Sequence, residues 1–196
     1  MTALTVDHMS GNGHDWDDVV RIWEDTDAPE GCKVEIIEGI VTVAPPPSKG
    51  HNLTAAKLQR QLYRNLPEDW EIFQTVGLTI PGKRGLYIPD LAVIPEDALI
   101  SPENRLVAGE AKLVVEITSR DNANHDRVSK THGYAQAEVP LYLLLDPWHS
   151  ARPTATLYGE PRGGIYQTLD VVEYGGHIHL PEPFDLDIDT GMFPVP

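Results

Sequence analysis

The chain has 196 residues, of which 41% are hydrophobic and 23% are charged, a composition typical of one soluble globular domain. Its single cysteine, Cys32, excludes an intrachain disulfide and a cysteine-rich zinc site. No apolar run approaches the ~20 residues of a membrane span, and we expect no signal peptide. The sequence therefore predicts a cytoplasmic protein without a membrane partner.

The net charge of −15 is unevenly distributed along the chain. Residues 10–46 and 160–196 have net charges of −7 and −6, whereas residues 47–159 have a net charge of only −1. A tight non-specific DNA binder has a basic stripe, and this sequence has none. The acidic charge therefore argues against nucleic acid as a partner. This argument is weakest for residues 47–159, which are nearly neutral.

The N-terminal third contains a polar end and two predicted helices. Residues 1–13 are small and polar, and we expect them to be disordered. Apolar residues recur at helical spacing in 14–25 and again in 51–66, where Leu53 opens the apolar face. Pro67 follows the second of these segments and ends it. The pattern predicts two amphipathic helices.

Two further segments alternate as strands do. Residues 32–43 alternate about Glu38–Gly39, which predicts a hairpin with Glu35 on the face opposite Ile36. Residues 70–80 are rich in β-branched and aromatic residues and predict one strand, bulged near its glycine. These strands precede the region in which we expect the functional residues.

Three apolar segments, 86–95, 112–119 and 140–147, dominate the centre of the chain. The polar loop at 96–111 is predicted to join the first two as antiparallel neighbours. The polar segment 124–137 is predicted to be a helix that joins the second and third as parallel strands. This part of the sequence therefore predicts a mixed sheet with flanking helices.

The C-terminal part changes to short alternating pieces separated by glycines. Residues 154–180 predict β-hairpins that close one end of the sheet. Residues 181–196 contain four prolines and predict a segment that covers the domain. We expect one α/β domain over 1–196, of the α+β type with a mixed sheet and a C-terminal β-hairpin region.

Two carboxylates lie inside apolar strand segments. Strand alternation places Asp90 on a face with Ile88 and Ala92, and places Glu116 on the face of Val114. A buried carboxylate is costly unless it is paired, hydrogen-bonded or bound to a metal. If the two strands pair, these carboxylates converge, and Mg²⁺ or Mn²⁺ prefers such oxygen ligands. Purely structural roles, a turn cap and an ion pair, remain open at this point.

The predicted helix 124–137 contributes a third group. Asp126, Lys130 and Tyr134 recur every four residues and therefore share one stripe. Lys130 is placed to face the sheet edge that carries Glu116, where it could orient a water molecule or stabilise phosphate charge. An ordinary surface pair between Lys130 and Asp126, and a packing role for Tyr134, are the alternatives.

The ordered set of these motifs resembles the Uma2 family of restriction-endonuclease-like proteins in the PD-(D/E)XK nuclease superfamily. The resemblance covers roughly residues 32–160. The motifs are Glu35-Ile-Ile-Glu-Gly, His51 opening a helix, Pro89-Asp90, Val-Val-Glu116-Ile-Thr-Ser119, Asp126-x3-Lys130-x3-Tyr134 and Val139-Pro-Leu-Tyr-Leu-Leu-Leu-Asp146-Pro.

The resemblance implies a restriction endonuclease-like core and a set of site residues. Asp90 and Glu116 would be metal ligands, Glu35 an additional acidic residue, and His51 a neighbour of the site. The superfamily's usual lysine lies two residues after the acid, and Thr118 occupies that position. The resemblance implies that Lys130 takes over this role.

Three functions are compatible with the sequence. The leading hypothesis is a Mg²⁺- or Mn²⁺-dependent endonuclease that hydrolyses DNA phosphodiester bonds, with Asp90, Glu116, Lys130 and Glu35 as catalytic residues. The competing hypothesis is a non-catalytic interaction or regulatory protein on a nuclease-like scaffold, which the net charge of −15 favours. A metal-dependent hydrolase of a small phosphoester is the third. A homodimer is plausible, because cutting both strands of a duplex needs two sites.

Overall fold

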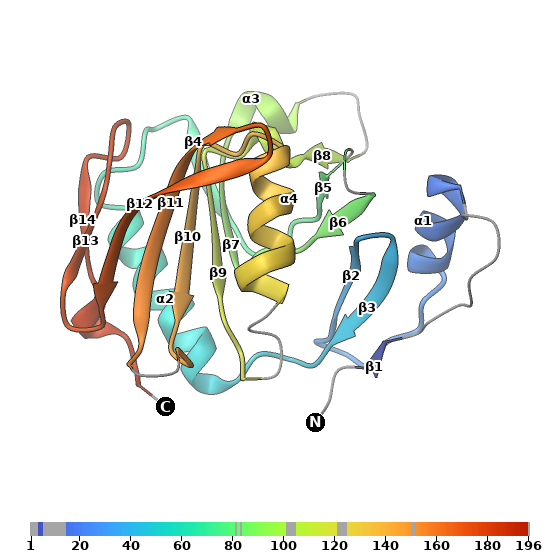
Figure 1. Cartoon of the computed structure of the whole chain (residues 1–196), viewed down its shortest axis with the longest axis horizontal. Coiled ribbons are helices and arrows are strands. Elements are labelled where there is room, and N and C mark those ends of the chain that lie inside the picture. The colour runs from blue at the N-terminus through green and yellow to red at the C-terminus, as the bar shows by residue number, and fades with distance from the viewer. Residues whose placement is uncertain are drawn as a thin grey trace.

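The structure is a computed structural model and describes residues 4–5, 15–80, 82, 84–100, 105–120, 125–149 and 152–195. Its centre is a six-stranded sheet in the order β12-β11-β10-β9-β7-β4, here named the central sheet (Figure 1). The strands of the central sheet are β4 (Trp70–Phe73), β7 (Leu91–Pro95), β9 (Leu113–Ile117), β10 (Leu141–Asp146), β11 (Thr154–Arg162) and β12 (Ile165–Glu173).

A second sheet of six strands, the side sheet, has the order β1-β3-β2-β6-β5-β8. Helix α1 (Trp16–Glu24) packs on it through Val19 and Val20, as the helical spacing predicts. The strands of the side sheet are β1 (Leu4–Thr5), β2 (Lys33–Ile37), β3 (Ile40–Ala44), β5 (Leu78–Ile80), β6 (Gly85–Tyr87) and β8 (Leu106–Val107).

Both predicted pairings at the centre of the chain are confirmed. β7 and β9 are antiparallel, and β9 and β10 are parallel with Glu116 opposite Leu144. The helical segment between β9 and β10 begins as a π-helix, η3 (His125–Lys130), and continues as α4 (Thr131–Gln136). The start expected at residue 124 lies outside the described residues.

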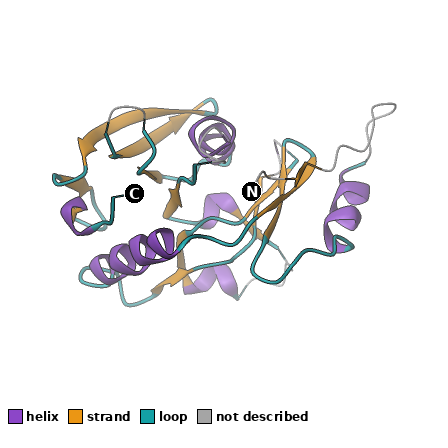
Figure 2. Cartoon of the chain, turned by 90° about the horizontal axis from the view of Figure 1, so that it is seen from below, coloured by secondary structure: helices purple, strands orange, loops and turns teal. Residues whose placement is uncertain are grey.

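Apolar layers cover the two faces of the central sheet, with a helix on each side (Figure 2). On one face, Leu58 and Leu62 of α2 (Lys49–Leu62) pack against Val115. On the other, Tyr134 of α4 packs against Val114. Successive strand residues point to opposite faces, so β9 contributes to both layers. None of the helices in the described ranges is long and apolar enough to cross a membrane.

The C-terminal hairpins are present as predicted. β11 and β12 form an antiparallel hairpin at the edge of the central sheet. β13 (His177–Leu180) and β14 (Leu186–Asp189) form a separate two-stranded sheet, followed by the short helix η4 (Thr190–Met192). Residues of this region complete the apolar layer beside α2. The expected cover segment thus contains a strand and a helical turn.

Two segments predicted as single strands are each divided between the two sheets. Residues 70–80 form β4 in the central sheet and β5 in the side sheet, and Thr75 between them has a φ of 61° that ends extended structure. Residues 86–95 form β6 and β7. Because Pro89 has no N–H to donate, the ladder is interrupted there. Asp90 therefore lies between strands and not on a strand face with Ile88 and Ala92.

Other boundaries also differ from the expectations. Helix α2 begins at Lys49 after the Ser48 cap and ends at Leu62, earlier than predicted, and Leu53 is exposed. The hydroxyl of Ser48 accepts a hydrogen bond from the backbone N–H of His51, which caps the helix at this early start. The loop at 96–111 contains a short helix α3 (Glu96–Leu99) and β8. Within 1–13, expected to be disordered, β1 pairs with β3, and the other residues lie outside the described ranges.

Candidate active site

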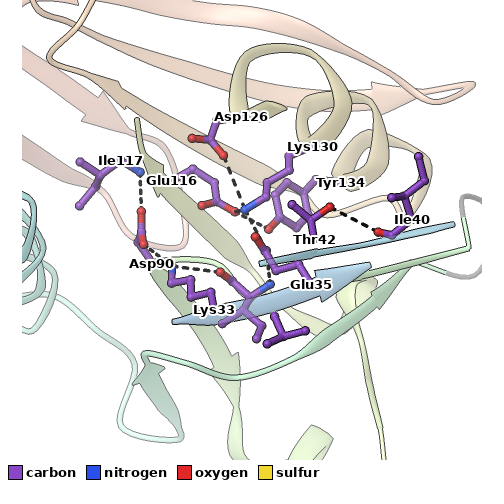
Figure 3. Close-up of polar contacts among 12 residues, drawn as sticks. Lys33, Glu35, Ile40, Thr42, Asp90, Glu116, Ile117, Asp126, Lys130 and Tyr134 are labelled. Carbon is purple, nitrogen blue, oxygen red and sulfur yellow. Dashed lines mark hydrogen bonds and ion pairs between the residues drawn. The ribbon is translucent and has the colours of Figure 1, made fainter. Parts of the chain in front are cut away.

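Lys130 is the centre of a buried cluster of carboxylates (Figure 3). Its Nζ lies 2.9 Å from Oε1 of Glu35, 3.0 Å from Oε1 of Glu116 and 3.5 Å from Oδ1 of Asp126. These acids come from β2, β9 and η3, so the cluster exists only where the two sheets and the helical segment meet. The sequence-based expectation that Lys130 faces Glu116 agrees with this geometry.

Hydrogen bonds fix the orientation of two of these carboxylates. Tyr134, one turn after Lys130, donates its hydroxyl to Oε1 of Glu116 at 2.7 Å. The backbone N–H of Ile88 donates to Oε1 of Glu35, also at 2.7 Å. Both bonds are charge-assisted when the carboxylates are ionised, and such bonds are stronger than neutral ones. The carboxyl groups are therefore held in place before any ligand binds.

Asp90 is buried and its carboxylate has three partners. The backbone N–H of Ile117 donates to its Oδ2 at 2.7 Å, which ties the β6–β7 connection to β9. Its Oδ1 lies 3.0 Å from Nε2 of His51 and is paired with Nζ of Lys33. Lys33 also donates to the carbonyl of Ile88 at 3.2 Å. Asp90 thus joins β2, α2 and β9 at one point.

Sequence reasoning did not identify Lys33 as a site residue. Lys33 and Glu35 are separated by one residue on β2, so strand alternation places both side chains on the same face. This alternation could have identified Lys33 as a neighbour of Glu35 in the site. Its partner Asp90 is distant in sequence, so the pair itself is not visible before folding.

The electrostatics of the cluster follow from burial and from the two lysines. Burial raises the pKa of Glu116 to about 8 and that of Asp126 to about 7, although Lys130 opposes both shifts. Burial lowers the pKa of Lys130, but the three carboxylates more than compensate and hold this pKa well above its ordinary value. Lys130 is therefore charged at neutral pH, while Glu116 and Asp126 are partly protonated.

The carboxyl group of Asp90 shifts in the opposite direction. Burial alone would raise its pKa, but hydrogen bonds and charge from His51 and Lys33 hold the pKa well below its ordinary value. Asp90 is therefore ionised throughout the physiological range. The two carboxylates predicted to bind the metal therefore differ in pKa: that of Glu116 is raised and that of Asp90 is lowered.

Thr118, at the position of the superfamily's usual lysine, belongs to a neighbouring network. Its hydroxyl donates to Oδ1 of Asp146 at 2.7 Å, across the parallel pair β9–β10. Arg127 donates to both oxygens of Asp146, from Nε at 2.7 Å and from Nη2 at 2.9 Å. A bidentate pair of this kind holds both side chains firmly. Asp146 and Arg127 were not predicted as functional residues.

A pocket of about 620 Å³ opens onto the cluster. Lysine, histidine and carboxylate side chains form its polar part, and a proline-rich stretch and one tryptophan form its apolar part. The predicted site residues that line it are Glu35, His51, Asp90, Glu116, Thr118, Asp126 and Lys130. Tyr134 does not line the pocket; it contacts Glu116 from within the fold. A volume of this size is typical of small-ligand sites.

The donor chemistry of the pocket is compatible with a divalent cation. Asp90 and Glu116 both line it, and carboxylate oxygens are the ligands that Mg²⁺ takes while keeping several waters. In the described part of the chain, no three histidine, cysteine or acidic side chains are already grouped as a metal would require. Lys33 and Lys130 instead neutralise the two carboxylates. An ion would therefore have to compete with these ammonium groups.

Comparisons with known proteins agree with the fold and the motifs. The structure is similar to that of a protein from Anabaena variabilis described as a "putative nuclease belonging to DUF820", with a TM-score of 0.68 and 19% sequence identity over 91% of this chain and 96% of that chain. At this identity the likeness concerns the fold. A search of curated proteins found no match. The family model "Uma2: Putative restriction endonuclease" matches residues 16–191. The chain therefore belongs to the Uma2 family.

Proposed function

We propose that this protein is a metal-dependent nuclease that hydrolyses phosphodiester bonds of DNA, with Mg²⁺ or Mn²⁺ as its cofactor. The observation that carries the proposal is the buried pair Asp90 and Glu116 on one pocket, with the ammonium group of Lys130 3.0 Å from Glu116. Clustered groups with strongly shifted pKa values in a pocket are typical of active sites. Membership of a family described as restriction endonucleases supports the same reaction.

Asp90 and Glu116 are the residues that would hold the cation. A bound divalent ion would lower the pKa of a coordinated water and neutralise charge on the phosphate. His51 and the N–H of Ile117 hold Asp90 in one orientation, and Tyr134 does the same for Glu116. Fixed ligands cost less entropy when the ion binds.

Lys130 supplies a fixed positive charge, because its side chain is buried and held by three carboxylates. A preorganised cation aimed at a phosphate stabilises the additional negative charge of the transition state. Glu35 and Asp126 keep Lys130 charged and in place, because both carboxylates lie within 3.5 Å of its Nζ. In this proposal Glu35 and Asp126 are positioning residues, and Lys130 contacts the scissile phosphate.

The distribution of charge is compatible with DNA as the substrate. Lys33, His51, Arg120 and Lys130 line the pocket, whereas the acidic excess of the chain lies mainly in residues 10–46 and 160–196. A phosphate in the pocket would therefore lie near the cations Lys33, Arg120 and Lys130, beside the carboxylates that pair with the two lysines. The expectation of a homodimer stays a prediction, because two sites are needed only if both strands of a duplex are cut.

A nuclease assay with Mg²⁺, Mn²⁺ or EDTA tests the proposal. We expect cleavage of a DNA substrate only with the cation, and a loss of about 100-fold or more in Asp90→Asn and Glu116→Gln. Glu110→Gln is the matched control: Glu110 also accepts a backbone N–H, from Val107, but does not line the pocket. Activity that persists undiminished in both site variants would contradict the proposal, provided that thermal unfolding shows all variants folded.

The pairing of both carboxylates with lysines favours one alternative, a non-catalytic interaction protein on the same scaffold. A protein of this kind would not be stabilised by modest concentrations of Mg²⁺, whereas a true metal site raises stability by mass action. A panel of small phosphoesters run beside the DNA substrate would separate the nuclease from a hydrolase of small substrates.

A further inference from the structure

Trp148 lines the apolar part of the active-site pocket and is 41% exposed. Among the described residues it is the only tryptophan with such exposure. Pro45, Pro46 and Pro47, in the connection between β3 and α2, line the same pocket. A ligand that enters therefore meets flat apolar surface in addition to the charged groups around Lys130. A ligand that combines an apolar planar group with an anion would contact both parts of the pocket.

The turn that carries Trp148 is held rigidly at the end of β10. The backbone N–H of Trp148 donates to Oδ1 of Asp146 at 3.2 Å. Asp146 is itself fixed by Thr118 of the neighbouring strand end and by the guanidinium of Arg127. This network gives Asp146, Thr118 and Arg127 a common role, which is to position the turn. An exposed ring on a fixed backbone loses little freedom when it stacks on a ligand.

Arg120 places a cation at the same edge of the sheet. β9 and β10 are parallel, and the N–H of Thr118 donates to the carbonyl of Leu145 at 2.9 Å, so the segments that follow the two strands start side by side. Arg120 is exposed and lines the pocket. It has no ion-pair partner within the ranges that the structure describes, in contrast to the paired Lys33 and Lys130. Its guanidinium is available to an anion.

The combined features match an unpaired nucleotide better than a duplex. A nucleobase can stack on an exposed tryptophan only when it is not already stacked and paired in a helix. A pocket of about 620 Å³ admits a nucleotide, whereas a duplex would have to be bound over an extended cationic surface. With a net charge of −15, the chain is poorly suited to supply such a surface.

We propose that Trp148 stacks on an unpaired base beside the scissile phosphate while Arg120 pairs with an adjacent phosphate, so that the preferred substrate is single-stranded nucleic acid. This inference rests on the proposed nuclease function, because it takes the floor of the pocket as the place of the scissile phosphate. The proline-lined wall excludes water from the stacked base. The site therefore selects for strand state and not for base identity, since every base has a face that can stack.

Binding measured without cleavage tests the inference. Fluorescence anisotropy in EDTA would compare a labelled single strand, the duplex of the same sequence and a single strand with abasic sites. We expect the intact protein to bind the single strand best, Trp148→Ala to weaken that binding by about 10-fold or more, and Trp148→Phe to retain most of it. Tyr63→Ala, which removes an exposed aromatic ring outside the pocket, is the matched control and should have no effect.

Two further readouts are specific to the proposed contacts. Binding of a single strand should quench tryptophan fluorescence in the intact protein and not in Trp148→Phe, although that variant still binds. Arg120→Gln should reduce the slope of log affinity against log salt by about 0.7, the value for one phosphate of a single strand. The abasic strand should bind the intact protein and Trp148→Ala equally, because it offers no base to stack.

The outcomes separate this inference from the proposed function. Equal binding of single strand and duplex, or unchanged binding by Trp148→Ala, would overturn the inference even if Mg²⁺-dependent cleavage is observed. The expected binding pattern without any cleavage would leave the stacking site in place and remove the nuclease function. If the intact protein binds none of the three oligonucleotides, the inference is overturned, and the cleavage assay with Mg²⁺ decides the proposed function by itself.

Discussion

Replacing Lys130 with methionine removes the charge that holds the buried cluster together. Methionine keeps an unbranched side chain of similar length, so the main loss is the ammonium group that now lies within 3.5 Å of Glu35, Glu116 and Asp126. Breaking a buried pair by removing one partner costs about 3–5 kcal/mol, because the remaining charge is left without compensation. We expect a loss of this size in the free energy of unfolding at pH 9.

The loss should depend on pH in a defined direction. The pKa values of Glu116 and Asp126 are already raised to about 8 and about 7, and removal of Lys130 raises both further. The folded variant then binds more protons than its unfolded chain, so its stability falls as pH rises. At pH 6 both groups are protonated, so neither is left as an uncompensated charge, and the variant loses mainly the hydrogen bonds of Lys130. We expect a loss of about 2 kcal/mol there.

Urea unfolding at pH 6 and pH 9 measures both values. Lys49→Met is the matched control, since Lys49 is exposed at the start of α2 and should change stability little at either pH. Adding Glu116→Gln to the Lys130 variant should recover part of the loss at pH 9, because the uncompensated charge is then absent. An equal loss at both pH values, or no loss at pH 9, would refute the assignment of Lys130 as the buried counter-ion of these acids.

Two predictions concern the cation. Glu116 has a pKa raised to about 8 and must be ionised to bind Mg²⁺. The rise in melting temperature on addition of Mg²⁺ should therefore grow between pH 6.5 and pH 9 and be absent in Glu116→Gln. A rise that is independent of pH would count against Glu116 as a ligand. Lys33→Met should bind Mg²⁺ more tightly in calorimetry, because the ammonium group on Asp90 no longer competes; weaker binding would show that Lys33 supports the site.

Many elements could be predicted from the sequence because local periodicity determines them. Helical spacing places Val19 and Val20 on the apolar side of α1, and strand alternation places Val114 and Val115 of β9 on opposite faces of the sheet. The structure buries all four residues in those positions. The parallel pairing of β9 and β10 follows from their helical connection, which admits essentially one arrangement. The meeting of Lys130 with Glu116 follows from the same unit, and it was predicted correctly.

Tertiary structure alone decided how the strands divide between two sheets and which partners surround Asp90. Residues 70–80 and 86–95 are each rich in apolar residues, and although Pro89 can interrupt a strand, local periodicity does not show that the two halves of a segment join different sheets. The partners of Asp90 are Lys33, His51 and the N–H of Ile117, all distant in sequence. A buried charge is stable only when an opposite charge or a hydrogen-bond donor lies within a few ångströms of it. Packing of the whole domain creates that proximity.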